Sequence, residues 1–347
     1  MTVRQSDAPP APEFANLVDL ASARVGGKAI AANDDFFAGK AALVKDEPAV
    51  WIADKYTTKG KWMDGWESRR RRTPGNDWCI VQLGMRGVVR GVDVDTSFFT
   101  GNFPSHCSIE AVDMPSAPRA AVHATNGPPW TTILEKTALR GDGSNFITIN
   151  DHRPWTHLRL SIYPDGGVAR LRVYGEVLVD WDRVAPNGKA VDLASVRNGG
   201  LFVTASDNHY GIRGALLMPD RAKHMGDGWQ TRRSRDLGHH DWAIVRLGTP
   251  GFVSKVEIDT NHFKGNYPDR ASLEGVMAVN VAPGNLGGMT WRTIVSETKL
   301  FAHRRHVYSG PQIEAAGPFS HVRLNIFPDG GVSRLRVIGR PDRGLND

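Results

Sequence analysis

The chain carries the same series of motifs twice, and this internal duplication limits its possible folds more than any other feature. The segment HLRLSIYPDGGVARLRVYG at 157–175 returns as HVRLNIFPDGGVSRLRVIG at 321–339, with 14 of 19 positions identical. Repetition over so long a period excludes a short-period solenoid and indicates two homologous domains. We predict an N-terminal arm at 1–16, a first domain at 17–175, a linker at 176–190, a second domain at 191–340 and a C-terminal tail at 341–347.

The composition and the strand pattern of each half are typical of an all-β domain. The 347 residues include 37 glycines and 21 prolines, an excess that favours many turns and argues against a helical bundle. Apolar runs such as IVQLG, GVDVDT and LRLSIYP are short and end near Gly, Pro, Asn or Asp. Short strands separated by frequent turns predict two tandem jelly-roll β-sandwich domains.

The repeated PDGG segment predicts a β-hairpin that brings arginines together. Apolar and polar residues alternate on both sides of the first copy, at 164–167. If the turn closes a two-residue loop, Arg159 lies opposite Arg172, and such like charges need a neutralising partner. That partner is either a bound carboxylate ligand or one of the structural carboxylates Asp93, Asp95 and Glu110.

The net charge bears on the possible ligands, and the two cysteines bear on the cellular compartment. The formal net charge is +6, which suits either a small anionic substrate or nucleic acid. Cys79 and Cys107 stand in strand-like segments without a CxxC pair, so we expect two buried thiols in a reducing cytoplasm. No apolar stretch is long enough for a membrane span, and the N-terminus lacks the pattern of a secretory signal.

The densest basic cluster is the run 69–72, which closely follows an Asp-Gly-Trp motif that both halves contain. Acidic residues at 64 and 67 lie beside it and no basic arm accompanies it, so we expect no nucleic-acid binding. A loop that binds a small anion and a purely solvated loop are both consistent with this pattern.

The histidines supply the candidates for proton transfer. His240 immediately precedes Asp241 in a motif whose first copy has Asn76 at that place, so this pair is a candidate general acid and base. The chain has no HExxH or CxxC motif, so a metal site has little support, although a divalent metal is left open. Walker and Gly-x-Ser-x-Gly motifs are missing too, which removes support for P-loop nucleotide binding and serine hydrolysis.

Taken together, the repeated motifs resemble those of the allantoicase (allantoate amidinohydrolase) family. The resemblance spans residues 18–340 and includes the tandem duplication. The motifs that carry it are KWMDGWESRRRR at 61–72, NDWCIVQLG at 76–84, VDVDTSFFTGNFP at 92–104, CSIEA at 107–111 and the PDGG segment at 157–175, with their second copies.

This resemblance implies two jelly rolls of galactose-binding-like architecture and a homo-oligomer. It also implies hydrolysis of a non-peptide C–N bond, from allantoate to ureidoglycolate and urea, in purine (allantoin) degradation. The family often shows His before the Asp-Trp of the second motif. If that His is catalytic, Asn76 implies a degenerate first site, while the second repeat keeps His240.

The chemistry of allantoate suggests roles for the repeated polar residues. Its carboxylate needs a cation, for which a bidentate Arg is suited, and the departing urea nitrogen needs a proton donor. Either water is directed to the central carbon, or a ureido proton is lost first and an imine forms. We assign catalysis to His240, Asp241 and Asp259. The predicted substrate-binding residues are Arg232, Arg233, Asp207, His209, Asn266, Glu274 and Arg323, with Arg69, Arg70, Asp35, Asp95, Asn102, Glu110 and Arg159 in the first repeat.

Two alternatives to an allantoate hydrolase are left open by the sequence. One is a non-catalytic jelly-roll protein that binds carbohydrate or another ligand, because the same fold serves both functions. The other is a hydrolase of a different ureido or amidino compound.

Overall fold

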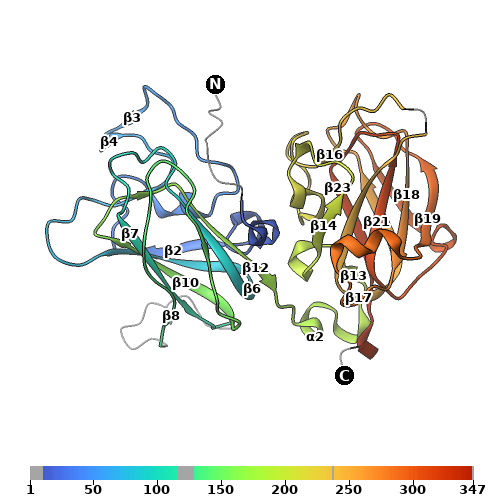
Figure 1. The fold of residues 1–347 in the computed structure, drawn as a ribbon, viewed down its shortest axis with the longest axis horizontal. Helices are drawn as coiled ribbons and strands as arrows, with labels where there is room; N and C mark the ends of the chain where they lie inside the picture. The colour runs from blue at the N-terminus through green and yellow to red at the C-terminus, as the bar shows by residue number, and fades with distance from the viewer. Residues whose placement is uncertain (1–10, 116–128, 237, 346–347) are drawn as a thin grey trace. The chain divides into compact units, whose positions relative to one another are not determined.

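Figure 1 shows the computed structural model of the chain, which describes residues 11–115, 129–236 and 238–345. The chain divides into two compact units, Met1–Leu178 and Val179–Asp347, which we call repeat 1 and repeat 2 and describe separately. Both consist of antiparallel strands and short helical turns, so the predicted pair of all-β domains is confirmed. In the described ranges, no helix is both long and apolar enough to cross a membrane.

Repeat 1 is organised around one long strand, β6 (Asp77–Asp95). Its main sheet has the order β1-β12-β6-β10-β7-β8, and β2 and β9 also pair with β6. The bounds are β1 (Val18–Asp19), β2 (Lys28–Ala32), β7 (His106–Val112), β8 (Thr131–Ala138), β9 (Phe146–Thr148), β10 (Pro154–Tyr163) and β12 (Arg170–Val177). Two small pairs are β3 (Tyr56–Thr57) with β4 (Gly60–Lys61) and β5 (Trp66–Glu67) with β11 (Gly167–Val168). The 3₁₀ turns are η1 (Glu13–Asn16), η2 (Ala23–Val25) and η3 (Lys40–Val44).

Repeat 2 has the corresponding arrangement around β17 (Asp241–Asp259). Its sheet has the order β13-β23-β17-β21-β18-β19, and β14 and β20 also pair with β17. The bounds are β13 (Val191–Asp192), β14 (Leu201–Ala205), β18 (Arg270–Val276), β19 (Arg292–Lys299), β20 (Arg305–Ser309), β21 (Phe319–Phe327) and β23 (Arg334–Pro341). A small sheet joins β15 (Tyr210–Gly211), β16 (Trp229–Gln230) and β22 (Gly331–Val332). The short helices are α2 (Trp181–Val184), η4 (Pro186–Gly188), η5 (Val196–Asn198), η6 (Arg213–Leu217), η7 (Pro283–Gly288), η8 (Gly310–Gln312) and η9 (Arg343–Leu345).

The central strand of repeat 2 brings both of its termini to the same end of the repeat. The first half of β17 pairs with β21 and the second half pairs with β23. Asp241 lies opposite Ile326 and Asp259 lies opposite Arg334, while the PDGG turn at 328–331 joins the two partner strands. In repeat 1 the first half of β6 pairs with β10 and the second half pairs with β12, so its termini also lie beside the PDGG turn. We call this end of each repeat the PDGG end.

Alternating apolar side chains of the strands form the core of each repeat. Leu158, Leu160 and Ile162 of β10 are fully buried, as their alternation predicts, and Leu324 and Ile326 take the same places in β21. Burying such a side chain stabilises a fold by about 1.5–3 kcal/mol relative to leaving it exposed. The duplicated apolar pattern therefore builds the same scaffold twice.

Both cysteines belong to the core of repeat 1. Cys79 and Cys107 are free and buried, as predicted. Burial raises the pKa of each thiol to about 12, so both are protonated at neutral pH and pack as small apolar side chains.

The PDGG segment does not form the predicted hairpin. β10 and β12 pair with β6 and not with each other, so β6 lies between them. The prediction that Arg159 faces Arg172 is therefore wrong, because the turn passes over β6 instead of closing a two-stranded ribbon. Arg159 lies opposite Glu110 and Arg172 lies opposite Asp93, which are two of the predicted neutralising carboxylates.

The segments outside the predicted domains contain short ordered elements. The end of the predicted N-terminal arm forms η1, where the ring of Phe14 packs against Phe146 and Tyr174. Residues 1–10 lie outside the described residues. Helix α2 and η4 fall within the predicted linker.

Candidate functional site

The PDGG end of each repeat holds a buried aspartate at the start of the central strand. This residue is Asp77 in β6 and Asp241 in β17. Their side chains are only 3% and 4% exposed. Burying a carboxylate destabilises the fold unless hydrogen-bond donors or positive charges surround it. The partners of each aspartate therefore indicate its role.

Repeat 1 surrounds its buried aspartate with fixed donors. Asn33 Nδ2 donates to Asp77 Oδ1 over 2.8 Å, and Arg71 Nη1 donates to the same oxygen over 2.8 Å. The backbone N–H of Arg71 donates to Asp165 Oδ2 in the PDGG turn, over 2.7 Å. A guanidinium keeps its proton at physiological pH, so this ion pair holds the structure but cannot transfer a proton.

Repeat 2 surrounds its aspartate with different side chains. Ser206 Oγ donates to Asp241 Oδ1 over 2.7 Å, and His239 Nε2 lies 3.3 Å from the same oxygen. Among the described residues, Oδ2 of Asp241 has no hydrogen-bond partner. The His239 side chain is 33% exposed, and an imidazole can both accept and donate a proton. Asp241 and His239 are therefore arranged as an acid–base pair.

A reciprocal exchange of side chains relates the two arrangements. Ser234 takes the place of Arg71, because its backbone N–H donates to Asp329 Oδ2 in the second PDGG turn, over 2.8 Å. In repeat 1, Gly75 leaves room for the guanidinium, since a Cβ there would lie 2.9 Å from Arg71 Nη2. In repeat 2 the same loop carries His239, whose ring contacts the carboxylate that the guanidinium contacts in repeat 1. Repeat 2 thus has a short side chain where repeat 1 has an arginine, and it has a histidine that repeat 1 lacks.

An exposed arginine lies on the loop next to this pair. Asp207 Oδ2 accepts the backbone N–H of Arg232 over 2.6 Å and lies 3.4 Å from its Nε. Burial alone would raise the pKa of Asp207, but the hydrogen bonds and the charge of Arg232 lower it overall, so it is a carboxylate. The Arg232 side chain is 67% exposed and can receive an anion. We call Ser206, Asp207, Arg232, Ser234, His239 and Asp241 the His239 site.

Repeat 1 keeps the arginine and pairs it with Asp34, which is not among the predicted substrate-binding residues. Arg69 Nε donates to Asp34 Oδ2 over 2.7 Å, whereas the predicted Asp35 pairs with Lys40 over 2.8 Å. Asp34 therefore corresponds to Asp207. Because both repeats keep this pair, it does not by itself distinguish them.

The structure places the predicted His240 beside the acid–base pair and not in it. The His240 ring is exposed and stacks on Phe327, with 5.5 Å between ring centroids. The contact with Asp241 comes from His239 instead. Arg233 and His209 are also exposed on the neighbouring loops, as predicted for ligand contact.

Sequence reasoning missed His239 because the motif points to His240, the residue directly before Asp241. A signal was present: the loop from Trp229 to Asp241 is one residue longer than the loop from Trp66 to Asp77. In this longer loop, His239 contacts the carboxylate of Asp241, whereas His240, the residue next to the aspartate, does not.

The predicted asparagines hold the turns of the PDGG end. Asn102 Nδ2 donates to Glu67 Oε1 over 2.6 Å. The backbone carbonyls of Asn102 and Asn266 accept the N–H groups of Gly167 and Gly331, each over 2.8 Å. The backbone contacts recur in both repeats, which favours a structural role. Arg70 is exposed and makes no hydrogen bond or ion pair within the described ranges.

Two other predicted pairs lie on strands and not in the loops of the PDGG end. Arg159 and Glu110 are 2.6 Å apart, and Arg323 and Glu274 are 2.7 Å apart, each pair joining neighbouring strands. In both repeats a tryptophan ring also lies against the guanidinium. Each of these arginines therefore already has a partner, which fits a structural network.

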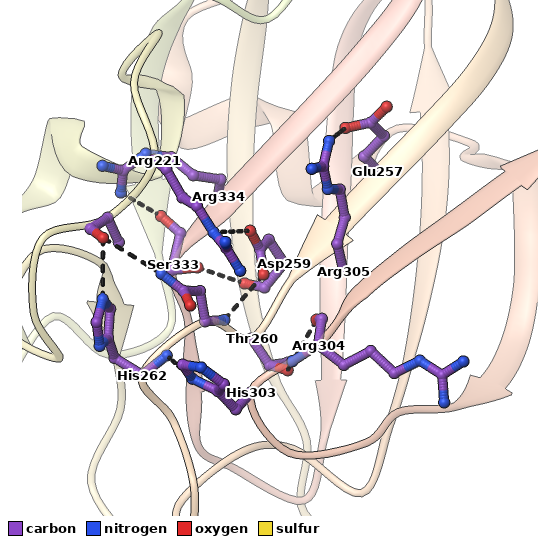
Figure 2. A network of polar contacts seen from close by, with 12 residues as sticks. Arg221, Glu257, Asp259, Thr260, His262, His303, Arg304, Arg305, Ser333 and Arg334 are labelled. Carbon is purple, nitrogen blue, oxygen red and sulfur yellow. Dashed lines mark hydrogen bonds and ion pairs between the residues drawn. The ribbon is translucent and has the colours of Figure 1, made fainter.

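Asp259, the third predicted catalytic residue, lines a separate cavity of about 180 Å³ at the PDGG end of repeat 2. Figure 2 shows Asp259 with Arg221, Arg305 and Arg334 around it. Asp241 does not line this cavity, although both residues stand at the PDGG end. The counterpart of Asp259 in repeat 1 is the predicted Asp95, whose Oδ1 accepts the backbone N–H two residues ahead.

No three His, Cys, Asp or Glu side chains lie together as metal ligands in the part of the chain that the structure describes.

Comparisons with known proteins find close similarity over nearly the whole chain. The allantoicase repeat family model matches residues 18–178 and 191–342. Probable allantoicase 1 of Burkholderia mallei is 49% identical over 339 residues, covering 96% of this chain and 98% of that protein. Probable allantoicase of Ralstonia nicotianae is 46% identical, with coverages of 95% and 97%. The crystal structure of allantoicase from Saccharomyces cerevisiae matches with a TM-score of 0.78 and 34% identity, covering 94% of this chain and 96% of that one.

Proposed function

The chain belongs to the allantoicase family, and we propose that repeat 2 hydrolyses allantoate to ureidoglycolate and urea at the His239 site. This activity belongs to purine (allantoin) degradation. One observation carries the assignment to that site: the structural ion pair of Arg71 and Asp77 in repeat 1 is replaced in repeat 2 by His239 and Asp241. The replacement introduces a group that can transfer a proton where repeat 1 has one that cannot.

The charged groups around the pair suit the substrate. Allantoate carries a carboxylate and two ureido groups on one carbon. The exposed guanidinium of Arg232 binds the carboxylate, and the neighbouring Arg233 adds a second positive charge. Asp207, a carboxylate beside them, accepts N–H bonds from a ureido group.

His239 moves the protons of the reaction. With Nε2–H directed at Asp241, Nδ1 accepts a proton from the N–H of the ureido group that stays on the product. The electron pair left on that nitrogen forms a C=N bond while the C–N bond to the other ureido group breaks. His239 gives the proton to the departing nitrogen, which leaves as urea.

Water completes the reaction at the imine. Its hydroxyl adds to the carbon, and its proton passes through His239 to the nitrogen, which gives ureidoglycolate and restores His239. Asp241 holds the imidazole in orientation and stabilises its charged form in both steps.

The test is urea release from allantoate by the purified protein and two neighbouring histidine variants. His239→Ala is expected to lower kcat by about 100-fold or more, the size of a general acid–base contribution. His240→Ala is the matched control, because this exposed histidine stacks on Phe327, and it is expected to keep most of the wild-type kcat. An unchanged His239→Ala enzyme would place catalysis elsewhere. A wild-type protein that releases no urea, with and without added Mn²⁺, would contradict the function itself.

We also propose that the protein acts in the cytoplasm as a homo-oligomer. The two free buried cysteines support a reducing compartment. Light scattering on the purified protein counts its subunits, and a monomer would contradict the oligomer.

A further inference from the structure

We propose that the cavity beside Asp259 in repeat 2 is a binding site for a small carboxylate anion, separate from the His239 site. Its volume of about 180 Å³ lies below the roughly 300–1,000 Å³ of sites for drug-sized ligands, so it suits a small molecule. Four arginines outnumber three carboxylates in its wall, so the lining is positive overall. The lining residues are Pro219, Asp220, Arg221, Glu257, Asp259, Arg305, Arg334 and Arg336.

Two of the arginines form the fixed floor of the cavity. Arg334 is buried, donates to the backbone carbonyls of Asp220 and Asp227 over 2.8 Å each, and lies 3.0 Å from Asp227 Oδ2. Arg336 donates to the carbonyl of Asp220 over 3.2 Å and lies 3.4 Å from Asp192 Oδ2. Their donors are engaged by the protein, so these two side chains shape the cavity.

The other two arginines are held weakly and face solvent. The side chains of Arg221 and Arg305 are 62% and 57% exposed. Arg221 Nε lies 3.9 Å from Asp259 Oδ2, and Arg305 Nη1 lies 3.5 Å from Glu257 Oε2 (Figure 2). The carboxylates are largely buried, but both guanidiniums lie mostly in solvent and far from them, so they remain able to bind another anion. A carboxylate suits them, since it can accept two parallel N–H bonds from a guanidinium.

Repeat 1 has neither of these two arginines. Pro48 takes the place of Arg221, because the carbonyls of the residues before them accept equivalent hydrogen bonds from Arg170 and Arg334. Ser144 takes the place of Arg305, because the carbonyls of the residues before them accept the N–H groups of Thr96 and Thr260. The duplicated scaffold therefore does not require guanidiniums at these positions. Their presence in repeat 2 points to a ligand and not to the fold.

The cavity and the His239 site share no residue. Asp227 contacts Arg334 of the cavity floor, and the chain continues from it through the buried Trp229 to Ser234 of the His239 site. A small ligand in the cavity thus leaves the His239 site open.

The experiment is a calorimetric titration of the full-length protein with malonate, a small dicarboxylate, at neutral pH. The double variant Arg221→Gln/Arg305→Gln is expected to bind malonate about tenfold more weakly or worse, because both charge-assisted contacts are lost. Arg69→Gln is the matched control: it removes a 63% exposed arginine of repeat 1 and is expected to leave the dissociation constant unchanged. Arg232→Gln, at the His239 site, is expected to leave malonate binding in the cavity unchanged, because Arg232 does not line it.

Urea release separates this proposal from the proposed function. The double variant is expected to keep the wild-type kcat, and its melting curve shows whether it is folded. Wild-type protein that binds no malonate, or a folded double variant that binds it equally well, would overturn the proposal. A double variant with kcat as low as that of His239→Ala would overturn both assignments, since catalysis would then take place in the cavity.

Discussion

The two repeats share their strand order and their PDGG turns, yet they treat the same buried aspartate differently. In repeat 1 an arginine neutralises Asp77 permanently, whereas in repeat 2 a histidine and a serine hydroxyl contact Asp241. The apolar positions of the two halves are alike, so the difference lies in a few loop residues. The comparison shows how a duplicated scaffold can keep its fold in one copy and acquire acid–base chemistry in the other.

Removing the charge of the aspartate in each repeat gives the largest expected contrast. Asp241→Asn is expected to lower kcat by about 100-fold or more, because an amide neither orients the imidazole correctly nor stabilises its charged form. Asp77→Asn is expected to leave kcat near the wild-type value and to lower the melting temperature, because Arg71 loses its charged partner. Urea-release kinetics and calorimetric melting measure both effects. Equal losses of activity in the two variants would contradict the division of roles.

The paired exposed arginines give a smaller contrast. Arg232→Gln is expected to reduce kcat/KM for allantoate by about tenfold, the loss of one charge-assisted contact with the carboxylate. Arg69→Gln removes the corresponding side chain of repeat 1 and is expected to change kcat/KM little. Steady-state kinetics decide: if only the Arg69 variant is impaired, substrate binds to repeat 1.

A buried carboxyl of repeat 1 gives an effect on stability alone. Burial and the nearby Asp95 raise the pKa of Asp93 from 3.8 to about 6. The folded state therefore binds this proton more tightly, and the resulting stabilisation is complete below about pH 4 and lost as the pH rises through about 6. Asp93→Asn is expected to raise the melting temperature in mildly alkaline buffer and to leave it unchanged near pH 4. A variant with the same difference at both pH values would contradict this assignment.

A buried histidine of repeat 2 gives the opposite pH dependence. Burial and the charge of Arg246 lower the pKa of His321 from 6.5 to about 4. Its contribution to stability is present above about pH 6.5 and is lost as the pH falls toward 4, because the unfolded chain takes up the proton first. His321→Gln is expected to flatten this acid dependence of melting. An unchanged pH profile would show that another group causes it.

The fold was largely predictable from the sequence. The duplication indicates two like domains, and the period-2 alternation indicates which strand residues are buried. Leu158 and Ile162 point into the core as predicted. The pairing of the strands around PDGG was not predictable, because the turn residues do not reveal that β6 inserts between β10 and β12.

The candidate site was predictable in its residue types and not in its contacts. The motifs pointed to Asp241, at the start of β17, and to Arg232, in the loop before that strand. They also pointed to His240, although the adjacent His239 contacts the carboxylate, because the direction of a loop side chain depends on local backbone geometry that the motif does not encode. Asp259 belongs to a motif of its own and lines a separate cavity, which the motif does not reveal.

The most direct test rebuilds the repeat 1 arrangement in repeat 2. The double variant Ser234→Arg/His239→Gly places an arginine at the position of Arg71 and removes the histidine, and Arg71→Ser is the control in the other repeat. We expect the double variant to fold and to release urea from allantoate at least about 100-fold more slowly, while the control stays near the wild-type rate. A folded double variant that releases urea at the wild-type rate would contradict the assignment of catalysis to the His239 site.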